Sequence, residues 1–149
     1  MKFVKYLVAT GLGVGYAPLA PGTAGSLFVL IVLYFIYPLS FWIMFIILIV
    51  LFLLGLYAAG EVEKDKGKDP SIVVIDEIVG MGISVIFLPR NWVLFLIAFF
   101  LFRIFDIVKP PPIMRSQKVP GALGIMIDDV IAGIYTLILA HLLRILFFQ

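Results

Sequence analysis

Three groups of ionisable residues stand in or beside apolar stretches of this 149-residue sequence. They are the pair Asp76-Glu77, the spaced set Arg103, Asp106 and Lys109, and the pair Asp128-Asp129. Ionisable groups in apolar helices are costly and tend to face a cavity or a partner. Clustered carboxylates are ligands that Mg²⁺ prefers, and cations beside them can bind phosphate oxygens. The combination indicates metal-assisted phosphoryl transfer.

The two acidic pairs differ in what else could explain them. Adjacent carboxylates diverge by about 100° on a helix, so we expect only one of Asp76 and Glu77 to bind a given ion directly. A favourable interaction with a helix N-terminus would explain one of Asp128 and Asp129 but not both. We therefore expect metal ligands in both pairs.

Arg103, Asp106 and Lys109 are spaced by three residues and share one face of a helix. An ion pair within the helix is the simpler explanation, and binding of a phosphate is the functional one. Asp106 is expected to act as a base or as a further metal ligand.

Further phosphate contacts are expected from the hydroxyl groups of Thr23, Ser26 and Ser71 and from Arg115. Helix capping is the alternative role for the three hydroxyl residues. The glycine-rich stretch 11–26 lacks the order GxxxxGK[ST], so a nucleotide-binding loop is not indicated.

Composition places the chain in lipid. Hydrophobic residues make up 64% and charged residues 13%, whereas roughly 45–50% and about 25% are usual for soluble domains. The mean hydropathy is +1.22. The absence of cysteine excludes a thiolate zinc site and a cysteine nucleophile, and the single histidine, His141, argues against an imidazole-rich zinc site. A net charge of +2 gives no indication of nucleic-acid binding.

The apolar stretches predict an all-α fold, a helical bundle with about five transmembrane helices in a single domain over 1–149. Each crossing needs roughly 17–25 residues. The predicted spans are 24–37, 41–60, 72–88, 92–108 and 124–147, after an interfacial segment 1–10. A turn is expected at Pro38, a polar block at 61–71 lies in water or at the headgroups, and prolines after Lys109 end the fourth span.

Charges are distributed unequally across this topology. All nine acids fall on the side where the first span begins. Nine of the eleven lysines and arginines share that side: Lys2, Lys5, Lys64, Lys66, Lys68, Arg103, Lys109, Arg115 and Lys118. Only Arg90 and Arg144 lie on the other. The positive-inside rule therefore makes the acidic side cytoplasmic.

The sequence resembles the phosphatidylglycerophosphatase A family along nearly its whole length. The resemblance rests on four stretches, of which the last two are long and specific: 21–26 (PGTAGS), 76–81 (DEIVGM), 102–110 (FRIFDIVKP) and 124–133 (GIMIDDVIAG). It implies Mg²⁺-dependent removal of the terminal phosphate from phosphatidylglycerophosphate, a phospholipid substrate, at the cytoplasmic face of a bacterial inner membrane. Family members often carry a histidine before the position of Ser71; none stands here, so no general acid is assigned.

The working hypothesis combines both lines of inference. Mg²⁺ held by Asp76 or Glu77 with Asp128 and Asp129 would neutralise the phosphomonoester, and water would attack it directly. A covalent aspartyl-phosphate is the rival mechanism. An ion transporter is the rival function, although its acids should lie near the bilayer midplane rather than at one end. A non-enzymatic membrane scaffold would leave the acids without a role, and the oligomeric state is not indicated.

Overall fold

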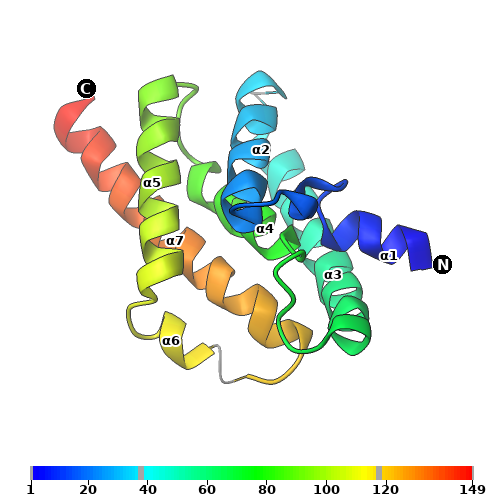
Figure 1. Cartoon of the computed structure of the whole chain (residues 1–149). Coiled ribbons are helices and arrows are strands. Elements are labelled where there is room, and N and C mark those ends of the chain that lie inside the picture. The colour runs from blue at the N-terminus through cyan, green and yellow to red at the C-terminus, as the bar shows by residue number, and fades with distance from the viewer. Residues whose placement is uncertain (1, 37–38, 117–118, 149) are drawn as a thin grey trace.

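The computed structural model describes residues 2–36, 39–116 and 119–148, and within these ranges the chain is helical and contains no strand. This confirms the predicted all-α class. The elements follow one another along the chain (Figure 1) as α1 (Lys2–Ala9), the short 3₁₀ helix η1 (Val14–Tyr16), α2 (Pro21–Ile36), α3 (Phe41–Lys66), α4 (Ile75–Val85), α5 (Trp92–Val108), α6 (Ile113–Ser116) and α7 (Ala122–Phe147). The turn expected at Pro38 and the cation Lys118 lie outside the described residues.

In the described part of the chain, two helices are long and apolar enough to cross a membrane. These are α3 and α7, each of 26 residues, or about 39 Å at 1.5 Å per residue. Only 22% of the most apolar window of each is buried inside the molecule, unlike the core helix of a soluble protein. Helices occupy the other three predicted spans too, but α2, α4 and α5 have 16, 11 and 17 residues. Five full crossings are therefore not established.

The short helix α4 lies at the centre of the bundle, where nine of its eleven residues are buried. It packs against α2, α3, α5 and α7. A Cβ added to Gly80 would lie 2.6 Å from the Asp129 carbonyl oxygen, and one added to Gly133 would meet the Gly80 carbonyl group. The small residue at position 80 thus allows a neighbouring helix to approach closely, and α7 is that neighbour.

Two boundaries differ from the prediction. Helix α3 continues through the polar residues to Lys66 and ends at Gly67, which adopts φ 94°. Glutamate and lysine favour helices as strongly as leucine does, so leaving the apolar stretch at Gly60 does not end the helix. Helix α4 begins at Ile75 rather than at residue 72, because the Val74 N–H donates to the Ala9 carbonyl oxygen outside the helix.

Helix α1 is fastened to the last turns of α3. Lys5 Nζ lies 3.0 Å from Asp65 Oδ2 and 3.5 Å from Glu61 Oε2, and Tyr6 Oη donates to Asp65. The hydrogen bond to Asp65 raises the pKa of Lys5 above its ordinary value, so this contact keeps its charge throughout the physiological pH range. Phe3 and Val4 remain exposed, as expected for an interfacial segment.

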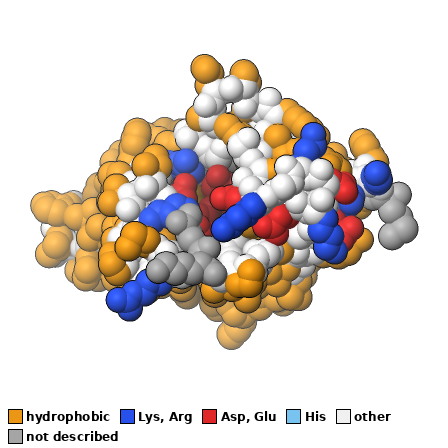
Figure 2. Space-filling view, turned by 60° about the horizontal axis from the view of Figure 1, so that its bottom comes forward, with side chains coloured by type: hydrophobic (Ala, Val, Ile, Leu, Met, Phe, Trp, Pro, Cys, Tyr) orange, Lys and Arg blue, Asp and Glu red, His pale blue; other side chains and the backbone are white. Residues whose placement is uncertain are grey.

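These elements bring the charged residues to one end of the molecule. α2, α4 and α7 begin there, and α3 and α5 end there (Figure 1). Seen from that end, acidic and basic side chains gather in a hollow surrounded by hydrophobic side chains (Figure 2). The unequal distribution of acids predicted from the sequence is therefore a property of the fold.

Candidate active site

A cavity of about 520 Å³ opens at the charged end of the bundle. Its walls come from the start of α2, the loop between α3 and α4, the first turn of α4, the last turns of α5 and the start of α7. Seven of the nine acids line it: Glu63, Asp69, Asp76, Glu77, Asp106, Asp128 and Asp129. Three cations among the described residues line it as well, namely Lys68, Arg103 and Lys109.

Three of these acids form what we call the carboxylate cluster: Asp76, Glu77 and Asp129. Each offers an oxygen, and the three oxygens lie within 4.8 Å of one another. Asp76 and Glu77 both contribute from the first turn of α4, so the geometry would let both bind one ion, whereas only one of them was expected to. Their side chains converge although their Cα–Cβ bonds diverge. The additional methylene group of glutamate allows this.

The carboxylate cluster contains polar atoms that the described residues leave unsatisfied. Asp76 Oδ1, Glu77 Oε2 and Asp129 Oδ2 are buried and have no hydrogen-bond partner. A buried polar atom without a hydrogen-bond partner destabilises the folded state, and several in one place indicate a ligand-binding site. Asp128 lies outside the cluster, because its Oδ2 is 2.6 Å from Lys109 Nζ.

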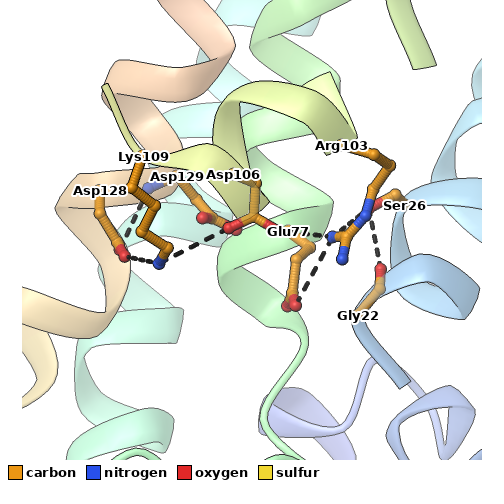
Figure 3. A network of polar contacts seen from close by, with 8 residues as sticks. All are labelled: Gly22, Ser26, Glu77, Arg103, Asp106, Lys109, Asp128 and Asp129. Atoms are coloured by element: carbon orange, nitrogen blue, oxygen red, sulfur yellow. Dashed lines mark hydrogen bonds and ion pairs between the residues drawn. The ribbon is translucent and has the colours of Figure 1, made fainter. Parts of the chain in front are cut away.

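Helix α5 presents its two cations to the cavity through ion pairs (Figure 3). Arg103 Nη1 lies 2.7 Å from Asp106 Oδ2 and 4.0 Å from Glu77 Oε1. Lys109 Nζ lies 3.7 Å from Asp106 Oδ1 and also contacts Asp128. Asp106 thus bridges both cations. The ion pair predicted within this helix is present, and both of its residues line the cavity. The pairing therefore leaves Arg103 beside the space that a phosphate would occupy.

The start of α2 fits against this network because residue 22 is glycine. A Cβ at Gly22 would overlap the Glu77 carboxylate and lie 3.3 Å from Arg103 Nη1. Ser26 Oγ donates to the Gly22 carbonyl oxygen and accepts a 3.5 Å hydrogen bond from Arg103. Free N–H groups at a helix start favour anions, so the start of α2 is suited to a negatively charged ligand.

The three hydroxyl residues predicted to contact phosphate do not all lie at the cavity. Thr23 and Ser71 line the cavity, whereas Ser26 stands behind its wall and holds Arg103. Capping does not explain Ser71, because the residue that caps α4 is Val74 and it makes no side-chain cap. Arg115 is exposed on α6 and does not line the cavity, so the structure does not bring it to the site.

Three charged residues that line the cavity were not predicted as site residues: Glu63, Lys68 and Asp69. All belong to the polar block after the second span. Their sequence context indicated water or lipid headgroups as their surroundings, but not the direction in which they point. Only the return of the chain into α4 brings this block over the carboxylates.

Seven carboxylates against three cations make the cavity a poor anion site by itself. A divalent cation fits the carboxylate cluster, because Mg²⁺ takes carboxylate oxygens and keeps several waters. Bound there, it would satisfy the unpartnered oxygens and offset their charge. Fold and site together define a helical protein with two apolar helices of membrane-spanning length and an acid-rich cavity at one end.

Comparison with known proteins names the family. The family model for phosphatidylglycerophosphatase A matches residues 7–144, and the chain belongs to this family. It is thus an enzyme, a phosphoric monoester hydrolase.

Three curated relatives are similar over most of their length. A putative phosphatidylinositol-3-phosphatase from Bacteroides thetaiotaomicron is 42% identical, covering 96% of this chain and 95% of the relative. Phosphatidylglycerophosphatase A from Haemophilus influenzae is 41% identical over 93% of this chain and 88% of its own. The Escherichia coli protein of that name is 37% identical over 87% and 77%. No solved structure matches the chain.

Proposed function

We propose that this protein hydrolyses phosphatidylglycerophosphate to phosphatidylglycerol and inorganic phosphate, with Mg²⁺ as cofactor, at the cytoplasmic face of a bacterial inner membrane. The observation that carries the proposal is the carboxylate cluster, in which three acids present unpartnered oxygens in the cavity of a phosphatase-family chain. Two of the relatives are phosphatidylglycerophosphatases by name.

The residues divide into two sets by what they contact. Asp76, Glu77 and Asp129 would hold Mg²⁺. Bound there, the ion supplies positive charge to the phosphate oxygens and lowers the pKa of water at the site. Asp128 serves this reaction through Lys109, which it holds at 2.6 Å, rather than as a ligand in the cluster.

Arg103 and Lys109 bind the phosphoryl oxygens and stabilise the charge that grows on them. Asp106 fixes both cations in place, because its two oxygens face one each. Because both of its oxygens are engaged by these cations, we assign Asp106 a positioning role instead of the base or further metal ligand predicted from the sequence. Thr23 and Ser71 provide hydroxyl groups at the cavity wall.

The reaction transfers the phosphoryl group to water. A water oxygen forms a bond to phosphorus, the bond from phosphorus to the glycerol oxygen breaks, and the proton lost by the water balances the one gained by the glycerol oxygen. Direct attack requires only positioning and charge stabilisation, which this cavity offers. A burst of one equivalent of phosphatidylglycerol per enzyme, released before the phosphate, would indicate the covalent route, because the phosphoryl group then stays on the enzyme until water removes it.

A second candidate substrate is phosphatidylinositol 3-phosphate. One relative, aligned over 96% of this chain, is named as a putative phosphatidylinositol-3-phosphatase. Both lipids carry a phosphomonoester on a polyol that a phosphodiester joins to diacylglycerol. The reaction at the carboxylate cluster would be the same.

The test is phosphate release by the purified protein from each lipid, with and without Mg²⁺. Release from phosphatidylglycerophosphate should require Mg²⁺ and should fall on the order of 10³-fold in Asp129→Asn. The matched control is Glu61→Gln, an acid at the same end that lies outside the cavity and pairs with Lys5 and Lys64. Metal-independent release, or full activity in Asp129→Asn, would refute the proposal.

The proposed topology has its own experiment, because the chain has no cysteine. Lys64→Cys places a thiol at an exposed position on the charged end, and Arg90→Cys places one before α5 at the opposite end. In right-side-out inner-membrane vesicles, an impermeant maleimide should label only the second variant. Labelling of Lys64→Cys from outside would invert the proposed orientation.

A further inference from the structure

Lys68 is the cation lining the cavity that makes no ion pair with any described residue. Arg103 and Lys109, in contrast, are each held by two carboxylates. Glu63 and Asp69 line the same cavity beside Lys68, yet neither lies within ion-pair distance of it. The ammonium group of Lys68 is exposed and available to a ligand.

The backbone around Lys68 is shaped to hold it at the cavity. Gly67 adopts φ 94° and Asp69 adopts φ 49°, so both neighbours occupy conformations that most residues avoid. The Val73 N–H donates to the Pro70 carbonyl oxygen, and the Val74 N–H donates to Ala9 on α1. Strained backbone that the surrounding structure maintains is often found at ligand sites.

Lys68 approaches the cavity from a different wall than the other two cations. Arg103 and Lys109 come from α5, whereas Lys68 comes from the loop between α3 and α4, on the other side of α4 (Figure 1). The exposed Lys68 stands at the mouth, and the buried carboxylate cluster lies deeper. The cavity thus offers two separate places for negative charge on a ligand.

The proposed substrate carries two phosphates. Its terminal phosphomonoester must reach the carboxylate cluster for hydrolysis. Its phosphodiester then lies toward the mouth, because it joins the headgroup to the diacylglycerol that remains in the lipid layer. A flexible lysine is a suitable point charge for an exposed phosphate that does not react.

We propose that Lys68 forms a subsite for the phosphodiester of the lipid headgroup and so favours lipids that carry a phosphodiester beside the reacting phosphomonoester. The inference rests on the proposed function for the placement of the reacting phosphate. It would let one site serve phosphatidylglycerophosphate or phosphatidylinositol 3-phosphate, and it predicts discrimination against phosphatidate, which has no phosphodiester.

The first measurement compares hydrolysis of phosphatidylglycerophosphate and phosphatidate by wild type, Lys68→Gln and the matched control Lys66→Gln. Lys66 is an exposed lysine two residues away that does not line the cavity. Lys68→Gln should lower kcat/KM on phosphatidylglycerophosphate about five- to tenfold, mainly through KM, as for one exposed charge contact to phosphate. Its effect on phosphatidate, and both effects of Lys66→Gln, should stay within twofold.

The second measurement is independent of hydrolysis. Short-chain phosphatidylglycerol has the phosphodiester but no phosphomonoester, so Lys68→Gln should weaken its binding to the solubilised protein by a similar factor. Inhibition by inorganic phosphate should not change. Unchanged phosphatidylglycerol binding, weaker phosphate inhibition, or an equal effect of Lys66→Gln would overturn the subsite. If wild type releases no phosphate from the lipid, the proposed function fails, and the binding comparison still decides this inference.

Discussion

Two clusters of charged residues lie at the same end of the molecule, and they differ in how completely their charges are paired. The first, which we call the α1–α3 clamp, consists of Lys5, Glu61, Lys64 and Asp65, and each of its acids contacts a lysine. The second is the carboxylate cluster, whose three acids retain buried oxygens without partners. Paired charges fasten helices together; unpaired buried charges cost stability and indicate a ligand. The comparison separates structural from functional acids.

The largest expected effect comes from removing a charge from the carboxylate cluster. Asp76→Asn should lower phosphatase activity on the order of 10³-fold, because a metal ligand is lost. Without Mg²⁺, the same variant should melt at a higher temperature than wild type, because one of three mutually repelling carboxylates is gone. Thermal unfolding with and without Mg²⁺ checks this. A variant that is less stable and fully active would place Asp76 with the clamp.

The next effect comes from the close approach of α2 to the carboxylate cluster. Gly22→Ala should reduce activity on the order of 10²-fold, since a methyl group would displace the Glu77 carboxylate from its position. The matched control is Gly60→Ala, whose Cβ would contact only the Ala122 side chain, at 3.2 Å. Steady-state kinetics of both variants provide the comparison. Equal losses would mean that the effect arises from helix packing rather than from the site.

A smaller effect is expected where the cluster acts through a second residue. Asp128→Asn removes the 2.6 Å ion pair that orients Lys109, and activity should fall about tenfold, as for partners that orient a functional group. Mg²⁺ affinity should change much less than in Asp76→Asn. If both variants lose Mg²⁺ affinity equally, Asp128 is a metal ligand, as first predicted from the sequence.

The smallest effect is expected in the clamp. Asp65→Asn keeps the shape of the side chain and weakens the contact between α1 and α3, so activity should stay within about twofold of wild type for an exposed ion pair. Activity and thermal unfolding measured together test this. A loss comparable to that of Asp128→Asn would show that α1 takes part in the reaction and would remove the distinction between the clusters.

Much of the site could be predicted from the sequence, because the acids are few and the chain is otherwise apolar. Asp76, Glu77, Asp106, Asp128 and Asp129 were expected to meet at one end, and all five line one cavity. Helix α5 occupies its predicted residues 92–108. Residues that start or stop a helix stand at both ends of this apolar stretch, so its boundaries can be predicted closely.

The depth of α4 was not predictable in the same way. Residues 72–88 are apolar enough for a crossing, yet the helix occupies only Ile75–Val85. Hydropathy reports the surroundings of a side chain, and a core helix enclosed by four others is as apolar as a membrane span. Hydropathy also gives no direction to charged residues outside the spans, so the sequence could not show that Lys68 lines the cavity and Arg115 does not.

The shortness of α4 has a consequence for where the lipid meets the enzyme. Ile75, at the start of α4, lies beside Gly55 of α3, eleven residues or about 16 Å before that helix ends. The acids of the carboxylate cluster therefore lie at the bottom of an open pit, below the rim formed by the end of α3. A headgroup can descend into this pit while its acyl chains stay in their own leaflet. Extraction of the lipid, with the exposure of its tails to water, is then unnecessary.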